Sequence, residues 1–122
     1  MLDRLREIYR RYGEHLYRIV PLSIEEDFLK CILYLDDGTN LRAVEEWREG
    51  RLIRYSYYWL TSANDLIIGW DNAPHHPEIP SYPHHKHVGS PIRREPALER
   101  GLEEVLDYIL AHPHTSTRSP DL

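Results

Sequence analysis

The sequence predicts an α+β fold, in which one antiparallel β-sheet, a meander of about four to six strands, carries packed N-terminal and C-terminal helices. Two observations support this class. Strand-like runs follow one another between residues 28 and 71, with connections too short to hold a crossover helix. Apolar residues with helical spacing occur before and after these runs. The length of 122 residues indicates a single domain, 1–122.

The N-terminal segment predicts an amphipathic helix that ends near Gly13, a residue typical of helix ends. Its arginines lie largely off the apolar stripe, so we interpret them as a solvated face, with contact to an RNA backbone as the alternative. The stripe comprises Leu2, Leu5, Ile8, Tyr9, Tyr12 and Leu16. Residues 15–27 are ambiguous, and a short strand near 16–21 is one interpretation.

The central runs are rich in β-branched and aromatic residues and alternate with turn sequences. The predicted strands are 28–35, 40–48, 51–60 and 66–71. The turns between them read "DDGT", "EG" and "TSAND", of which the first is a typical hairpin turn. These short turns favour a meander, in which each strand pairs with the next.

The C-terminal segment predicts a second helix with an apolar stripe. We expect Pro96 in its first turn, where the N–H that proline lacks is not needed, and Pro113 just beyond its end. The stripe comprises Leu98, Leu102, Val105, Leu106, Ile109 and Leu110. The polar residues 112–122 predict a flexible tail.

Composition favours a cytoplasmic globular protein. The net charge of −5 does not indicate nucleic-acid binding by the whole molecule, although a local basic patch would suffice for it. The single cysteine, Cys31, forbids an internal disulfide, and its apolar neighbours favour a buried, unreactive thiol. The charged N-terminus lacks a signal-peptide core and no apolar run approaches membrane-spanning length, so we expect no membrane partner.

The segment "WDNAPHHPEIPSYPHHKHV", residues 70–88, holds five of the eight histidines. Its prolines recur at every third residue, a spacing that favours a polyproline II path. We therefore predict a histidine-rich loop over 71–88. A bend within 78–82 would bring the first Pro-His-His unit, at 74–76, close to the second, at 83–85.

Clustered histidines suit RNA cleavage by general acid–base catalysis, because an unperturbed imidazole titrates near neutral pH. We expect one of His75 and His76 to act with one of His84 and His85. Lys86 would stabilise the charge of the transition state. The alternatives are a divalent metal held by the same histidines, although no zinc-type ligand spacing is present and no cofactor is expected, and a solvated loop without chemistry.

Further candidates surround this segment. Asp71 would orient an imidazole, with a turn shared with Asn72 as the alternative, and Glu45 shares an otherwise apolar strand face. Tyr57 belongs to an aromatic row that suits the core better than base stacking. The predicted catalytic residues are Glu45, Asp71, His75, His76, His84, His85, Lys86 and His87; the predicted binding residues are Tyr57, Asn72, Arg93 and Arg94.

The unit Asp71 to His76, followed by Pro83 to His87, resembles the signature of TumE-type toxins of toxin–antitoxin pairs. The similarity extends over about residues 28–110. The resemblance implies a toxin neutralised by a cognate antitoxin from an adjacent gene; an RNA substrate is our inference from the histidine chemistry. A homodimer is a further expectation. The alternative functions are a metal-dependent hydrolase or nucleotide-modifying enzyme and a non-enzymatic, partner-binding module.

Overall fold

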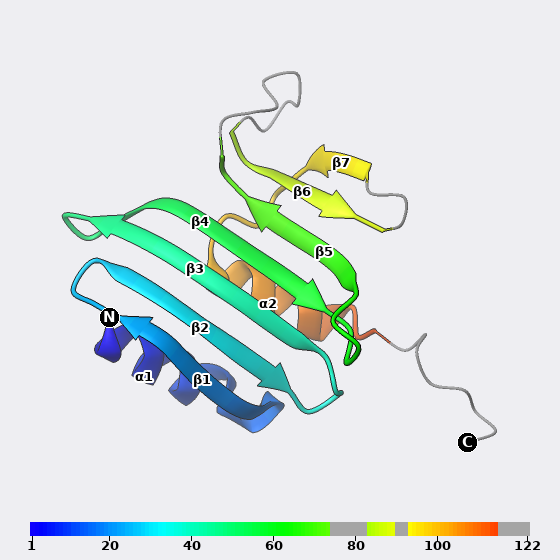
Figure 1. The fold of residues 1–122 in the computed structure, drawn as a ribbon, viewed down its shortest axis with the longest axis horizontal. Coiled ribbons are helices and arrows are strands. Elements are labelled where there is room, and N and C mark those ends of the chain that lie inside the picture. Colours follow the sequence, from blue (N-terminus) through cyan, green and yellow to red (C-terminus); the bar gives the residue numbers. More distant parts are fainter. Residues whose placement is uncertain (74–82, 90–92, 115–122) are drawn as a thin grey trace.

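The computed structural model describes residues 1–73, 83–89 and 93–114, and consists of one seven-stranded antiparallel sheet with two α-helices (Figure 1). Each strand pairs with its neighbour in sequence, so the strand order is β1-β2-β3-β4-β5-β6-β7. The elements are α1 (Leu2–Tyr12), the 3₁₀ turn η1 (Gly13–His15), β1 (Leu16–Ile24), β2 (Phe28–Leu35), β3 (Asn40–Arg48), β4 (Arg51–Leu60), β5 (Leu66–Asp71), β6 (His85–Val88), β7 (Arg93–Pro96) and α2 (Leu102–Ala111).

The α+β class and the four central strands, β2 to β5, are confirmed with their predicted bounds. The sheet has more strands than the four to six expected, because β6 and β7 extend it beyond β5. The predicted loop over 71–88 is correspondingly wrong at its end: residues 85–88 form β6, whose backbone pairs with β5 and β7. The proposed bend at 78–82 lies outside the described residues.

The second helix begins later than the sequence suggested. Pro96 ends strand β7 instead of opening the helix, which starts at Leu102. Proline fits an edge strand such as β7, which pairs with a neighbouring strand on one side only. On the unpaired side no ladder hydrogen bond forms, so the N–H that proline lacks is not needed there. Leu98, expected in the apolar stripe, is 82% exposed in the connection.

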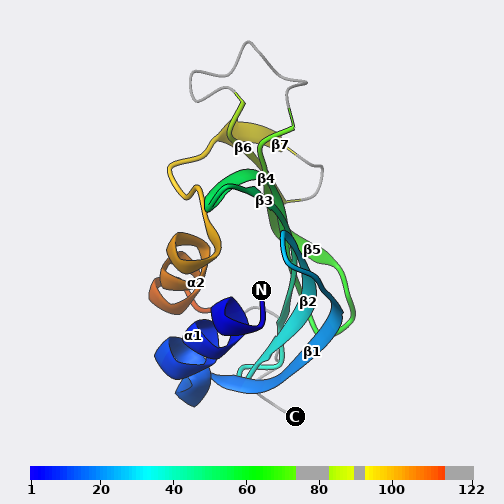
Figure 2. The same ribbon diagram turned by 90° about the vertical axis from the view of Figure 1, so that its left-hand side faces the viewer.

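Both helices pack against the same face of the sheet and leave the other face uncovered (Figure 2). Strand alternation explains this division, since odd-numbered residues of β2 and β3 point toward the helices and even-numbered ones point away. The core between the layers includes Leu5, Ile8, Leu29, Leu33, Leu41, Tyr57, Trp70, Val105, Leu106 and Ile109. We call the second surface the open face of the sheet.

Two further expectations concern reactivity and membranes. Cys31 lies in the core, and burial raises the pKa of its thiol to about 12, which makes the thiolate scarce near neutral pH. This confirms the buried, unreactive interpretation. Among the residues that the structure describes, no helix combines the length and apolarity needed to cross a membrane.

Candidate functional site

The end of the β5–β6 hairpin brings Asp71, His85 and His87 together. Asp71 is the last residue of β5 and pairs with His85, while His87 lies opposite Gly69. Because residues two apart on a strand share a face, both imidazoles reach the Asp71 side chain on the open face. Nε2 of His85 lies 3.0 Å from Oδ1 of Asp71, and Nε2 of His87 lies 3.3 Å from Oδ2. We call these three residues the Asp–His–His cluster.

The cluster is held firmly by its surroundings. The backbone N–H of Ala73 donates to Oδ1 of Asp71 at 2.9 Å, which fixes the carboxylate just after the strand ends. Nδ1 of His85 lies 3.0 Å from the carbonyl oxygen of Pro83, and the His85 and His87 rings meet edge to face at 4.9 Å. His85 is 1% exposed, whereas the His87 side chain is 15% exposed. A solute can therefore reach His87 more readily than His85.

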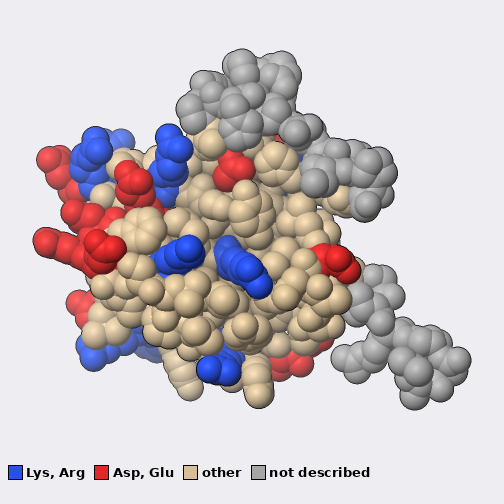
Figure 3. Space-filling view, in the orientation of Figure 1, with Lys and Arg blue, Asp and Glu red and all other residues tan. Residues whose placement is uncertain are grey.

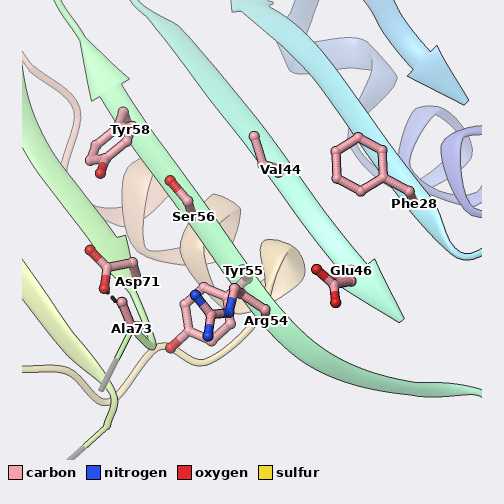
Figure 4. Close-up of a pocket in the computed structure, with 9 residues that line it drawn as sticks. All are labelled: Phe28, Val44, Glu46, Arg54, Tyr55, Ser56, Tyr58, Asp71 and Ala73. Carbon is pink, nitrogen blue, oxygen red and sulfur yellow. Dashed lines mark hydrogen bonds between the residues drawn. The ribbon is translucent and has the colours of Figure 1, made fainter. Parts of the chain in front are cut away.

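A pocket of about 260 Å³ opens beside Asp71 on the open face (Figure 4). Its lining comprises Phe28, Val44, Glu46, Arg54, Tyr55, Ser56, Tyr58, Asp71 and Ala73. The Asp71 side chain forms part of the wall on the β5 side, as the close-up shows. A carboxylate oriented toward two imidazoles thus borders a cavity that also offers aromatic and basic side chains. Such a combination is a typical starting point for a functional-site hypothesis.

His84, which directly precedes β6, and Lys86 within it lie on the other side of the sheet, toward the helices. Nδ1 of His84 lies 2.9 Å from the Tyr55 hydroxyl, and the two rings stack with centroids 5.8 Å apart. Desolvation, with smaller contributions from the charges of Arg100 and His85, lowers the pKa of His84. His84 therefore packs as a neutral ring near neutral pH, separated by the sheet from the Asp–His–His cluster.

Lys86 follows the same alternation. Its Nζ lies 3.7 Å from Oε1 of Glu99 and 5.2 Å from the centre of the Tyr108 ring. The Nε1 of Trp70 donates a hydrogen bond to the same Glu99 oxygen. These contacts tie β6 to α2 through Tyr108, and they tie both β5 and β6 to Glu99 in the segment that precedes the helix. The geometry favours a packing role for Lys86 over a role beside the two clustered imidazoles.

Glu45 is fully buried on the helix face, where four donors surround its carboxylate. Arg4 donates from Nε and Nη2, Trp47 from Nε1 and Tyr57 from its hydroxyl, at 2.5 to 3.0 Å. Arg4 also pairs with Glu103 of α2. Burial alone would lower the pKa of Arg4, but the hydrogen bonds and charges of Glu45 and Glu103 raise it above its ordinary value. Sequence reasoning identified Glu45 and missed Arg4, which looked like part of a solvated helix face.

Of the remaining candidates, some take part in hydrogen bonds or strand pairing with the backbone, and the others lie outside the residues that the structure describes. Asn72 clamps the first half of β4: its Oδ1 accepts from the Tyr55 N–H and its Nδ2 donates to the Ile53 carbonyl. Arg93 and Arg94 belong to β7, where the register pairs them with Val88 and His87. His75 and His76 lie outside the described residues. Sequence reasoning missed the pocket residues of β4, Arg54, Ser56 and Tyr58, although their even numbers place them on one strand face.

Comparison with known proteins identifies the family. A family model described as Toxin TumE matches residues 6–113, which include every strand and both helices in whole or in part. No curated protein and no solved structure matches the chain. The matched span contains the Asp–His–His cluster and the residues that line the pocket. The chain belongs to the TumE family of toxins.

Proposed function

We propose that this chain is the toxin of a toxin–antitoxin pair and that it cleaves RNA at the Asp–His–His cluster. One observation carries the chemistry: a nearly buried carboxylate faces two imidazole Nε2 atoms at 3.0 and 3.3 Å beside an open pocket. A carboxylate in this position orients the imidazoles and stabilises their protonated form. Histidine suits both halves of an acid–base cycle near neutral pH.

The proposed reaction is a transesterification. A neutral imidazole takes the proton of an RNA 2′-hydroxyl, and the 2′-oxygen attacks the adjacent phosphorus. A cyclic phosphate forms as the bond to the 5′-oxygen breaks, and a protonated imidazole supplies the proton that this leaving oxygen needs. His87, which is partly exposed, is the proposed contact with the substrate, and Asp71 and His85 position it.

The sequence predicted that His75 or His76 acts with His84 or His85; in this proposal, the partner of His75 or His76 in proton transfer is His87 instead. His75 and His76 lie outside the described residues, so this role rests on the sequence and on the need for a second imidazole. Each can be tested separately by replacement with glutamine.

The test uses untagged protein and two labelled oligonucleotides, an RNA and its 2′-deoxy counterpart. We expect cleavage of the RNA alone, with a bell-shaped pH profile. His87→Gln should lower the rate roughly 10²–10⁴-fold. His15→Gln is the matched control, because His15 is a partly exposed histidine on η1 far along the chain from the cluster. Equal cleavage of both oligonucleotides, or full activity of His87→Gln, would refute the mechanism.

A metal-dependent hydrolase is the second candidate, favoured by the same cluster. Asp71, His85 and His87 each offer a ligand atom, and these atoms lie within 4.8 Å of one another. Two imidazoles and a carboxylate are a common ligand set for zinc and related ions, which activate water for hydrolysis. Elemental analysis and chelator titration distinguish the candidates: stoichiometric metal and chelator-sensitive activity would replace the acid–base proposal.

A further inference from the structure

The open face of the sheet is not covered by either helix (Figure 2). Strand register places the Asp–His–His cluster on this same face. Its composition differs from that of an ordinary solvated surface. Polar and charged side chains alternate with aromatic and aliphatic ones over β2, β3 and β4. In the space-filling view, two basic side chains stand in the middle of a broad area that is otherwise uncharged (Figure 3).

The charge of this area is mainly positive, against a net charge of −5 for the whole chain. Lys30, Arg42 and Arg54 are exposed on even-numbered strand positions, and Glu46 is the acid among them. Within the described ranges, no carboxylate forms an ion pair with any of these three basic side chains. Their charges are therefore available to a ligand, and the acidic remainder of the molecule would direct a polyanion toward this face.

An aromatic platform lies beside these charges. Tyr58 is 38% exposed and pairs with Gly69 of β5. A Cβ atom at Gly69 would lie 2.4 Å from Cδ1 and 2.6 Å from Cε1 of the Tyr58 ring. The ring therefore lies directly against the Gly69 backbone. It occupies the space that the side chain of any other residue at position 69 would fill. Phe28 lines the far side of the same pocket.

Strand register joins these features to the cluster. Arg42 pairs with Tyr58, Tyr58 with Gly69, and Gly69 with His87. Three strand spacings separate the first residue of this row from the last, or roughly 14 Å. The adjacent row runs from Lys30 through Val44 and Ser56 to Asp71 and His85. Charges, platform and cluster thus follow one another across the strands.

We propose that the open face of the sheet binds single-stranded RNA and guides it to the Asp–His–His cluster, an inference that rests on the proposed function. Phosphates would contact Lys30, Arg42 and Arg54, and an unpaired base would stack on Tyr58. Single strands fit because their bases have free faces for an aromatic side chain, whereas a duplex keeps its bases stacked inside. The alternation of cations with an aromatic ring is the arrangement that such strands require.

Binding is tested without cleavage by using a fluorescent, single-stranded RNA whose sugars all carry 2′-O-methyl groups, which block the 2′-hydroxyl reaction. Lys30→Gln combined with Arg42→Gln should weaken binding and make it less dependent on salt, by about 0.7 in the log–log slope for each lost phosphate contact. Tyr58→Ala should weaken binding roughly 5- to 150-fold. Fluorescence anisotropy at several salt concentrations measures both effects.

The matched control is Arg6→Gln combined with Arg10→Gln, which removes the same charge from exposed positions of α1 on the other side of the molecule. We expect it to bind like the wild type. Gly69→Ala is a second probe, because its methyl group must displace the Tyr58 ring; it should weaken binding as Tyr58→Ala does while leaving every charge in place.

Each result has one meaning. No RNA binding at low salt, or equal losses in the open-face and α1 variants, would overturn the inference. Unchanged RNA binding together with lost antitoxin binding in the open-face variant would also overturn it and assign this face to the protein partner. RNA binding that follows the expected pattern, with no cleavage of unmodified RNA, would support the inference and refute the proposed reaction instead.

Discussion

At the residue scale, the buried carboxylates of Glu45 and Asp71 have different surroundings. Glu45 meets an arginine, a tryptophan and a tyrosine among the core side chains, whereas Asp71 meets two histidines beside a pocket. The donors of the first set do not exchange protons near neutral pH, so they can only hold the carboxylate in place. The second set consists of imidazoles, the side chains that proteins most often use as general acids and general bases. Glu45 therefore stabilises the fold, and Asp71 is the carboxylate suited to chemistry.

Glu45→Gln tests this distinction. Removing one partner of a buried ion pair leaves the Arg4 guanidinium with Glu103 alone, so the free energy of unfolding should fall by about 3 kcal/mol. Glu46→Gln, the exposed neighbour, is the control and should change stability little. Urea denaturation measures both, and RNA cleavage by the folded Glu45→Gln protein should match the wild type. A catalytic role for Glu45 would appear as lost cleavage at unchanged stability.

At the element scale, local signals predicted the strands from β2 to β5, whereas pairing explains β6 and β7. The central strands have alternating burial and turn sequences of their own, so their bounds could be read directly. Strands β6 and β7 have four residues each and take their conformation from the neighbour across the ladder. The same ladder determines which histidines lie close together. If residues 85–88 are treated as a loop, the sequence does not show that His84 and His85 lie on opposite faces of the sheet.

The attachment of β6 to β4 through His84 should depend on pH. The pKa of His84 in the folded protein lies below its ordinary value of about 6.5, because of burial first and of Arg100 and His85 second. Burial raises the pKa of Tyr55, so its hydroxyl keeps a proton to donate to Nδ1 of the neutral ring. The unfolded chain therefore takes up a proton first as pH falls. The contribution of His84 to stability should be complete above about pH 6.5 and decline below it.

Urea midpoints between pH 8 and pH 5 measure this effect in the wild type and in His84→Gln. We expect the wild type to lose more stability than the variant over this range. Parallel curves would show that His84 does not titrate differently in the folded and unfolded states.

At the scale of the whole molecule, family membership implies a neutralising partner. The proposed active cluster and the open face are continuous, so an antitoxin that covers residues near 70–88 would block both. Expression of the chain alone should arrest growth, and co-expression of the adjacent gene should restore it. The two proteins should co-elute in size-exclusion chromatography at micromolar concentration, and His87→Gln should co-elute equally well while losing toxicity. Separate elution of two folded proteins would argue against this partnership.

The link between Arg4 and Glu103 has a further consequence for the order of events in the cell. The two residues are 99 positions apart, and ribosomes add about 5–20 residues per second, so Arg4 waits roughly 5 to 20 s for Glu103 to be synthesised. Helix α2 covers the face of the central strands that lies opposite the open face, and it is synthesised equally late. A nascent chain therefore cannot close its core until α2 has been synthesised. An antitoxin already present in the cell has those seconds to meet the toxin before it matures.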